Sequence, residues 1–304
     1  MTETQRLDLA LVERGLARSR TAARAAIEEG RVSIDGRAVV KPSHPVKPDA
    51  RLDVDGDDRY VSRAALKVAA ALDAGALDVT GAQALDLGAS TGGFTQVLLE
   101  RGARRVIALD VGHGQLDPAL RADPRVVVVE GENARALTAD RLAEVSGGAV
   151  SAAEPIDLVV ADLSFISLTL VLPAIVATVG TEVPLVVLIK PQFEAGRLGI
   201  REGIVRDAAI RDDAIMAVLW AASDLGLHAS ELISSPIVGS AGNHEYLAVF
   251  RPGAGVHPTE WRGRATALSS VLPGTPDTAP LNAAQPNAAQ PDRSQPDRSQ
   301  EDPS

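Results

Sequence analysis

The sequence predicts an α/β protein whose main domain is a doubly wound, mostly parallel sheet, with a small α+β unit before it and a disordered tail after it. Between Ser62 and about Pro252, apolar runs of strand length alternate with helical patterns, which is typical of a parallel sheet covered by helices on both faces. The first 55 residues show helices and a hairpin of their own, and the chain ends in polar repeats. We therefore expect domains at 1–55 and 62–252, joined by a linker at 56–61.

Composition excludes several classes of protein. The 304 residues are 45% hydrophobic but only 3% aromatic, so the core must be built from Ala, Val, Leu and Ile. The chain has no cysteine, which excludes disulfides, thiolate metal sites and cysteine nucleophiles. The opening MTETQRLDLA lacks the basic and apolar regions of a secretion signal, and the apolar run at 168–179 is too short to span a membrane. We expect a cytoplasmic protein with no membrane or metal partner.

The predicted tail covers residues 253–304. From about Gly253 the apolar periodicity fades, and NAAQPNAAQP is followed by PDRSQPDRSQ. A segment of Pro, Gln, Asp and Ser cannot bury enough apolar surface to offset the entropy of its chain. We expect the part from about 270 to 304 to be disordered and dispensable for chemistry.

The first 55 residues predict two helices and a hairpin. An apolar face indicates a first helix that Gly15 can end, and Ser19 can cap a second helix that Gly30 ends. The run VSIDGRAVV then indicates a β-hairpin that turns at Asp35-Gly36.

Positive charge is concentrated in this N-terminal unit. It carries 10 Lys and Arg against 9 Asp and Glu, whereas residues 56–252 carry 16 against 25. Guanidinium groups on a compact surface suit contacts with phosphates, although a solvated helix face would show the same charges. The candidates for RNA binding are the basic residues of the helix–hairpin segment: Arg18, Arg20, Arg24, Arg31, Arg37 and Lys41.

The segment RLDLALVERGLARSRTAARAAIEEGRVSIDGRAV resembles the small RNA-binding domain named after the ribosomal protein S-four. It is similar to that module in its two helices and in the turn that follows them, and the resemblance covers most of residues 6–53. Because domains of this type bind structured RNA, the resemblance implies an RNA partner for the basic residues.

The main domain contains seven apolar runs of strand length. In a doubly wound sheet, ligands bind beyond the carboxyl ends of the strands, so functional residues are expected directly after these runs. The runs are Gln83–Leu87, Arg105–Leu109, Val126–Val129, Leu158–Ala161, Leu185–Ile189, Leu232–Val238 and Leu247–Phe250.

A glycine-rich loop, LGASTGGF, follows the first run and precedes a helix. Its spacing, Gly-x-x-x-Gly-Gly, lacks both the dinucleotide fingerprint and the G-K-[ST] of triphosphate sites. Asp86 before the loop would repel a pyrophosphate but could pair with an ammonium group, and Asp110 after the second run could accept the hydroxyls of a ribose. A ligand with a ribose, an ammonium group and no phosphate is S-adenosylmethionine.

The candidates for binding this cofactor are Asp86, Gly88, Ser90, Thr91, Gly92, Gly93, Phe94, Asp110 and Asp162. Residues 112–116 could line an adenine pocket. Glycine after one strand and aspartate after the next also occur in other α/β domains, so the pattern alone leaves the ligand open. A second site that uses His113 as a catalytic base is an alternative.

Four polar residues fall where their strands or helices should open towards that ligand: Lys67, Asp162, Lys190 and Glu245. Each could have a purely structural role, but Lys190 ends a strongly apolar run and is followed at once by a proline. The 2′-hydroxyl of a ribose is a poor nucleophile, and a lysine that is buried near a second cation could accept its proton. Carboxylates could orient the lysines and favour the sulfonium centre.

In order and context, this series resembles the Lys-Asp-Lys-Glu tetrad of the FtsJ-like RNA 2′-O-methyltransferases. Together with the N-terminal module, the chain resembles the TlyA family of ribosomal RNA cytidine 2′-O-methyltransferases, historically labelled haemolysins. The motifs that carry the resemblance are YVSRAALK, LDLGASTGGFT, ALDVGHGQL, VVADLSFISL, LIKPQFE, GIVRD and GNHEY.

The resemblance implies a Rossmann-like class I methyltransferase domain that transfers a methyl group from S-adenosylmethionine to a cytidine ribose in small-subunit and large-subunit ribosomal RNA. It implies that Lys190 is the base, that Lys67 and Asp162 are its partners, and that Glu245 is an orienting group. Members of the family influence susceptibility to ribosome-targeting peptide antibiotics.

The resemblance also adds Asn133 to the expected cofactor contacts. The chain departs from the family at Gly131, in the segment expected near the adenine, where a different residue is usual. The long repeated tail is a second departure.

Three other functions stay open at this point. A pore-forming haemolysin would need a membrane-active surface, and the sequence shows none. A non-catalytic ribosome-binding or assembly protein would carry the same N-terminal module, and a Lys190→Ala variant distinguishes it from an enzyme. A base methyltransferase would commonly carry an N/D-P-P-Y/F segment after the fourth strand, where this chain has DLSF.

Overall fold

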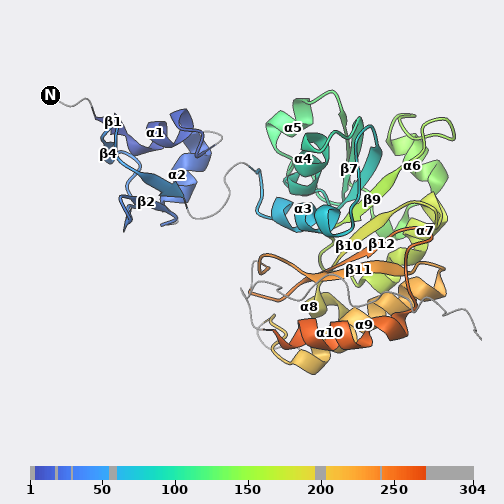
Figure 1. The fold of residues 1–304 in the computed structure, drawn as a ribbon. Helices are drawn as coiled ribbons and strands as arrows, with labels where there is room; N and C mark the ends of the chain where they lie inside the picture. Colours follow the sequence, from blue (N-terminus) through green and yellow to red (C-terminus); the bar gives the residue numbers. More distant parts are fainter. Residues whose placement is uncertain are drawn as a thin grey trace, which may run out of the picture.

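The computed structural model describes residues 4–17, 20–28, 30–54, 60–195, 203–239 and 242–271 (Figure 1). They form an N-terminal unit and a main domain, and each has hydrophobic clusters of its own. The predicted α/β class and the small α+β unit before it are confirmed.

The N-terminal unit packs two helices with two small sheets. Leu7, Leu11 and Ile27 are fully buried between them. Asp35 and Gly36, with φ values of 51° and 78°, turn the chain between two strands, as the sequence predicts. The elements are β1 (Gln5–Arg6), α1 (Leu7–Glu13), α2 (Arg20–Glu28), β2 (Val32–Ile34), β3 (Arg37–Ala38), β4 (Pro45–Val46) and β5 (Leu52–Val54), with sheet orders β1-β4 and β3-β2-β5.

The main domain is built on a seven-stranded sheet of order β11-β12-β10-β9-β6-β7-β8. The five strands from β10 to β8 in this order are parallel, whereas β12 runs antiparallel to both of its neighbours. The strands are β6 (Gln83–Leu87), β7 (Arg105–Asp110), β8 (Val126–Glu130), β9 (Leu158–Ala161), β10 (Leu185–Ile189), β11 (Ala229–Ser234) and β12 (Tyr246–Phe250).

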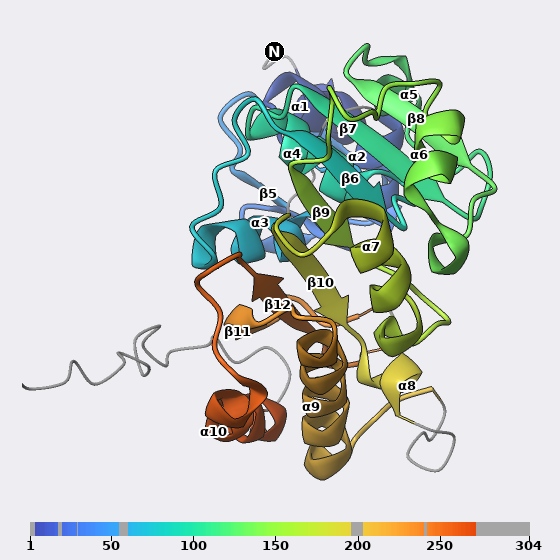
Figure 2. The ribbon, with the colours of Figure 1, turned by 90° about the vertical axis from the view of Figure 1, so that its right-hand side faces the viewer.

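Helices cover both faces of this sheet, and Figure 2 shows it running between α3 and α7. Side chains alternate between the two faces, so β6 sends Leu85 and Leu87 into one core and Ala84 into the other. The helices are α3 (Ala65–Ala74), α4 (Gly93–Glu100), α5 (Pro118–Ala122), α6 (Ala139–Val145), α7 (Leu172–Val179), α8 (Pro191–Glu194), α9 (Ala208–Asp224) and α10 (Pro258–Ser270), with short 3₁₀ turns η1 (Ala134–Ala136) and η2 (Leu168–Leu170). Within the described ranges, none of these helices is long and apolar enough to cross a membrane.

The sixth strand differs from its prediction. The apolar pattern predicts it at Leu232–Val238, but β11 covers Ala229–Ser234. Pro236 explains the early end, because proline has no backbone N–H for the ladder. The apolar residues that follow it belong to the loop that leads to β12.

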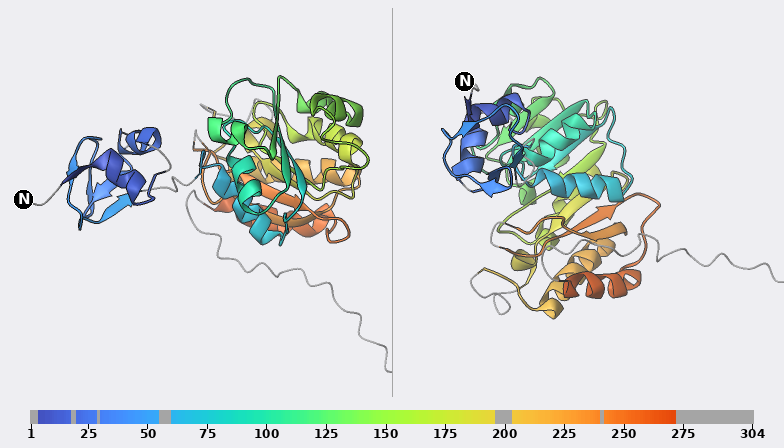
Figure 3. Two further views of the ribbon diagram at one scale, coloured as in Figure 1. Left: turned by 90° about the horizontal axis from the view of Figure 1, so that it is seen from above. Right: turned by 60° about the vertical axis from the view of Figure 1, so that its left-hand side comes forward.

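The predicted tail, residues 253–304, starts too early, because its first part forms a helix. Residues 258–270 form α10, which packs along α9 beneath the sheet (Figure 3). Ala265 and Leu268 are buried in the same core as the sheet, and Trp261 packs against it. Their i, i+4, i+7 spacing is that of one helical face, but the polar residues around it conceal the pattern. Residues 272–304, which include the repeats, lie outside the described part of the chain.

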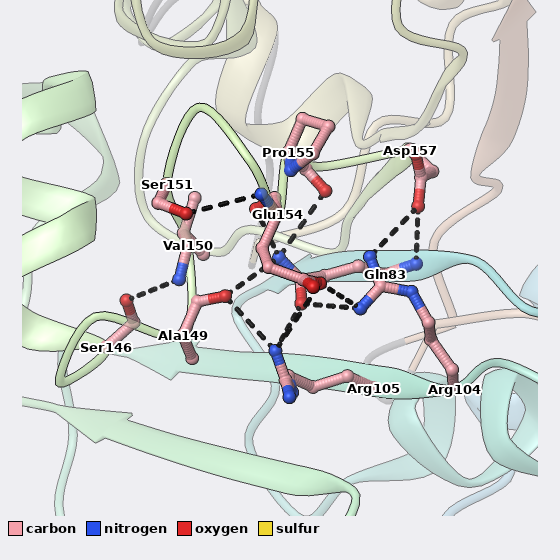
Figure 4. A network of polar contacts seen from close by, with 10 residues as sticks. All are labelled: Gln83, Arg104, Arg105, Ser146, Ala149, Val150, Ser151, Glu154, Pro155 and Asp157. Carbon is pink, nitrogen blue, oxygen red and sulfur yellow. Dashed lines mark hydrogen bonds and ion pairs between the residues drawn. The ribbon is translucent and has the colours of Figure 1, made fainter.

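A polar network ties the amino ends of the strands together (Figure 4). The buried Gln83, at the start of β6, donates hydrogen bonds to the carbonyls of Ala149 and Glu154 at 3.1 and 2.8 Å. Arg105 donates to its side-chain oxygen at 2.9 Å, and Arg104 pairs with Glu154 at 2.5 Å. This network fastens the loop before β9 at the edge away from the carboxyl ends, so its role is structural.

Candidate active site

The glycine-rich loop lies at the carboxyl edge of the parallel strands. Gly88, directly after β6, has a φ of +82°, and a Cβ there would stand 2.6 Å from the carbonyl oxygen of Asp162. Because that neighbour is backbone, it cannot move aside, and only glycine fits at this position. The backbones that leave β6 and β9 therefore touch directly beneath the site.

Asp110, at the end of β7, joins two loops of the site. Its Oδ2 accepts the backbone N–H of Ser90 at 2.8 Å, and its Oδ1 accepts that of Gly112 at 2.7 Å. Ser90 has a φ of +48°, a strained conformation for a residue with a side chain. The Asp110 hydrogen bond helps to hold Ser90 in this conformation.

A pocket of about 510 Å³ opens beside these loops. It is lined by five of the residues predicted to bind the cofactor: Gly88, Ser90, Asp110, Asn133 and Asp162. Thr91 to Phe94 are not among the lining residues within the described ranges, and Phe94 is buried in the core shared by α3 and α4. Val111, Gln115 and Arg135 line the pocket as well, and Gln115 belongs to the segment expected near an adenine.

Asp86 is fully buried behind the loop and is not itself a lining residue. Thr95 donates a hydrogen bond of 2.7 Å to its Oδ2, whereas its Oδ1 has no hydrogen-bond partner in the described part of the chain. Burial, together with the carboxylates of Asp162 and Asp110, raises the pKa of Asp86 to about 7, although the hydrogen bond from Thr95 lowers it. This concentration of negative charge would favour a cationic ligand.

The first of two buried ion pairs joins α3 to the last strand of the sheet. Lys67 Nζ lies 2.6 Å from Glu245 Oε2 and donates a hydrogen bond to it. Only 6% of Lys67 and 4% of Glu245 are exposed. Gly239 makes room for the carboxylate, since a Cβ there would stand 2.5 Å from Glu245 Oε1.

The second ion pair joins the ends of β9 and β10. Lys190 Nζ lies 2.6 Å from Asp162 Oδ1 and donates a hydrogen bond of 2.8 Å to Ser164 Oγ. Lys190 is 7% exposed, and Asp162 and Ser164 both line the pocket. The amine therefore stands next to two residues of the pocket wall, paired with one carboxylate and hydrogen-bonded to one hydroxyl.

Strand pairing brings the two ion pairs to one edge. In the antiparallel pair of β10 and β12, Ile189 faces Tyr246, so Lys190 and Glu245 follow at the next facing position. Asp162 directly follows β9, the parallel neighbour of β10. The four residues singled out from the sequence thus lie at one edge of the sheet, and Asp162 among them lines the pocket.

A cluster of aromatic and polar side chains lies next to Lys190, and the sequence analysis did not name its members as site residues. Phe165 is 91% exposed, has a φ of +64°, and lies 5.2 Å from the ring of Phe193. Glu194 accepts hydrogen bonds from Ser167 Oγ and from the backbone N–H of Leu168, at 2.5 and 2.9 Å, and burial raises its pKa. Glu194 thus ties the loop after β9 to the loop after β10. The signal available in the sequence is the short spacing of these residues from Asp162 and Lys190.

Two of the basic residues predicted to bind RNA are paired with carboxylates. Arg20 lies 3.4 Å from Asp8, and Arg24 lies 3.8 Å from Glu28. Arg37 and Lys41 are exposed and Arg31 is half-buried, whereas Arg18 lies outside the described residues.

Asp8 is a buried carboxylate that the sequence did not reveal as important. Arg6 donates two hydrogen bonds to it, at 2.9 and 2.8 Å. The Arg6 hydrogen bonds lower the pKa of Asp8, against the effect of burial, and Arg20 lowers it further. Asp8 therefore holds Arg6 and Arg20 side by side with about half of each side chain exposed.

Among the described residues, no group of three or more histidine, aspartate and glutamate side chains is arranged to hold a metal ion.

Comparison with known proteins agrees with this geometry. Residues 60–251 match the family of FtsJ-like methyltransferases, and residues 5–52 match the S4 domain. The 16S/23S rRNA (cytidine-2′-O)-methyltransferase TlyA of Mycobacterium tuberculosis is 48% identical over 254 residues, which are 83% of this chain and 91% of that protein. Hemolysin A of Brachyspira hyodysenteriae is 38% identical over 81% of this chain and 99% of that protein.

A solved structure from Streptococcus thermophilus, described as a hemolysin, covers 88% of this chain and 95% of its own, with a TM-score of 0.66 at 34% identity. A second one from Lactococcus lactis covers 68% and 98%, with a TM-score of 0.60 at 39% identity. The chain therefore belongs to the FtsJ-like methyltransferases and, within them, to the TlyA family, with an S4 domain before its methyltransferase domain.

Proposed function

We propose that this protein transfers a methyl group from S-adenosylmethionine to the ribose 2′-hydroxyl of a cytidine in ribosomal RNA. The observation that carries the proposal is the presence of two buried ion pairs, Lys67–Glu245 and Lys190–Asp162, at the edge of the sheet where Asp162 lines the pocket. The ribosomal RNA substrate and the cytidine come from the names of its relatives. Ribosomal subunits are cytoplasmic partners, so we expect the protein to act in the cytoplasm.

The pocket residues suit S-adenosylmethionine, which supplies an electrophilic methyl group when it is bound. Asp110 would accept the ribose hydroxyls, and Asn133 and Gln115 would contact the adenine. Asp86, with its unpartnered oxygen among the described residues, and Asp162 would favour the positive charge of the cofactor. A site with three neighbouring carboxylates fits this cation better than it fits a phosphate-bearing nucleotide.

Lys190 is the proposed base. When the 2′-hydroxyl oxygen accepts the methyl group that the cofactor gives up, Lys190 Nζ would take the proton that the hydroxyl loses. Asp162 pairs with this nitrogen and Ser164 Oγ accepts a hydrogen bond from it, so both would keep Nζ at the pocket. Lys67, held by Glu245, would orient the hydroxyl in line with the reacting carbon.

The N-terminal unit would hold the RNA. Arg20, Arg24, Arg37 and Lys41 would contact its phosphates, and we add Arg6 to this set because Asp8 holds it beside Arg20. We propose the division into an RNA-binding unit at 1–55 and a methyltransferase domain from 62 onwards, and we extend the latter beyond 252 to include α10.

Transfer of tritiated methyl groups to isolated ribosomal subunits, followed by mapping of a blocked 2′-hydroxyl, tests the proposal. Lys190→Ala is expected to keep RNA binding and lose methyl transfer. Transfer to a base nitrogen or carbon would overturn the reaction class, and transfer retained by Lys190→Ala would overturn the role of Lys190.

A further inference from the structure

Two buried side chains outside the tetrad connect the C-terminal helix to Glu245. Asn243 is 2% exposed and Arg211 is 5% exposed, and neither lines the pocket. Within the described ranges, their hydrogen bonds join them to backbone groups of two segments, residues 203–206 and Ser269. A buried guanidinium that binds carbonyls is unusual, because a buried charge needs strong compensation.

Arg211, on α9, binds two segments that are far apart in the sequence. Its Nε donates to the carbonyl of Ser269, near the end of α10, at 3.1 Å. Its Nη1 donates to the carbonyls of Val205 and Arg206 at 3.2 and 2.8 Å. One buried cation therefore holds the C-terminal helix and the segment before α9 together.

Asn243 binds the same segment before α9. Its Oδ1 accepts the backbone N–H of Val205 at 3.0 Å, and its Nδ2 donates to the carbonyl of Gly203 at 2.8 Å. The amide thus uses both of its ends on one short stretch of backbone. This fixes the turn that contains Asn243 to residues 203–205.

Asn243 also holds Gly239, the residue against which the carboxylate of Glu245 packs. We call this contact the seat of Glu245. The carbonyl of Asn243 accepts the N–H of Gly239 at 2.9 Å, and Gly239 packs against Glu245 Oε1. The other carboxylate oxygen, Oε2, holds Lys67. A shift of the turn would therefore move the carboxylate and, with it, the Lys67 ammonium.

We propose that Asn243 and Arg211 are positioning residues for methyl transfer: they form a relay of backbone hydrogen bonds that runs from α10 through residues 203–206 to the seat of Glu245. The relay rests on the proposed function, because it acts through the Lys67–Glu245 pair. It also gives α10 a role in the active site, although this helix lies in the segment whose composition indicates a tail.

The test compares variants of the full chain by kinetics and by hydrogen exchange. Asn243→Ala and Arg211→Met are expected to lower kcat about 10- to 100-fold while the KM for S-adenosylmethionine changes less than threefold. Arg211→Lys, which can still reach a carbonyl, is expected to recover part of kcat. Gln83→Met is the matched control, because it removes a buried amide that also binds carbonyls but lies at the opposite edge; it should lower the melting temperature and leave kcat within twofold of the wild type.

Hydrogen exchange tests whether the relay exists, and it needs no activity measurement. Arg211→Met should speed exchange at Val205 and at Gly239, whose N–H groups are bound by Asn243, and Gln83→Met should not. Unchanged exchange at these amides, or a kcat that falls equally in Gln83→Met, would overturn the relay. A wild-type protein that transfers no methyl group would instead overturn the proposed function, and the exchange data would still decide the relay.

Discussion

Glu245 Oε2 lies 2.6 Å from Lys67 Nζ, and this buried contact joins the first helix of the main domain to the last strand of its sheet. Two charges taken out of water gain little net stability over an apolar pair of similar size, whereas one charge left alone in the interior is costly. The pair is therefore better explained by chemistry than by stability. The two contributions can be separated by removing one or both charges.

Removing one partner of this pair should destabilise the fold and removing both should not. Glu245→Gln or Lys67→Met leaves one buried group without its charge partner, so we expect a loss of about 3–5 kcal/mol in the free energy of unfolding. The double variant Lys67→Met/Glu245→Leu should recover most of that loss. Methyl transfer should stay at least roughly 100-fold below the wild type in all three. Denaturant unfolding and transfer assays measure both; a double variant with recovered activity would contradict the catalytic role.

The pKa of Asp86 predicts how cofactor binding depends on pH. In the free protein this pKa is about 7, because burial and two neighbouring carboxylates oppose ionisation. A cationic ligand favours the ionised form, so binding should release a proton below pH 7 and tighten as the pH rises from about 6 to 8. Calorimetry in buffers of different ionisation enthalpy measures the proton release. Asp86→Asn should abolish it, and an unchanged release in that variant would assign the proton to another group.

The same shift has a consequence for stability. Because the folded pKa of Asp86 is raised above the ordinary value of 3.8, its contribution to stability is full below about pH 3.8 and is lost as the pH rises through about 7. The ligand-free Asp86→Asn variant should therefore be more stable than the wild type at about pH 8, with a smaller difference at about pH 5. Thermal unfolding at the two pH values measures this, and an equal difference at both would contradict the assigned pKa.

The sequence predicted the sheet and the tetrad because both leave local signals. Apolar runs mark the strands, and parallel pairing brings residues such as Asp162 and Lys190, which directly follow their runs, to one edge. Lys67 and Glu245 left a weaker signal, since neither follows a parallel strand, and their roles were predicted only through the resemblance.

The supporting residues left no comparable signal. Asn243 and Arg211 bind backbone groups. Because nearly every residue has the same backbone groups, the sequence does not reveal such partners. Thr95 and Ser164 are ordinary polar residues until Asp86 and Lys190 are placed beside them. The helix α10 was missed because its few apolar positions stand in a polar segment next to the repeats.

The contacts of Asp8 with two arginines lead to a prediction about RNA binding by the N-terminal unit. Asp8→Asn removes the charge that orients Arg6 and Arg20, so we expect several-fold weaker binding to ribosomal RNA, although the variant removes a negative charge from the protein. Asp49→Asn is the control, because it removes an exposed carboxylate of the same unit and should bind RNA equally or slightly more tightly. Filter binding at two salt concentrations measures the effect. Equal behaviour of the two variants would contradict the role of Asp8.

The buried face of α10 predicts that the methyltransferase domain continues past residue 252. Leu268 is 2% exposed and packs in the core of the sheet, so Leu268→Ala should cost about 2–5 kcal/mol of unfolding free energy. A chain that ends after Val271 keeps Ser269, the partner of Arg211, and should retain both the melting temperature and kcat of the full chain. A chain that ends after Pro252 loses the helix and should unfold at a much lower temperature. Equal melting temperatures for the two shortened chains would show that α10 contributes nothing to the domain, because Leu268 and the Ser269 carbonyl are lost only in the shorter one.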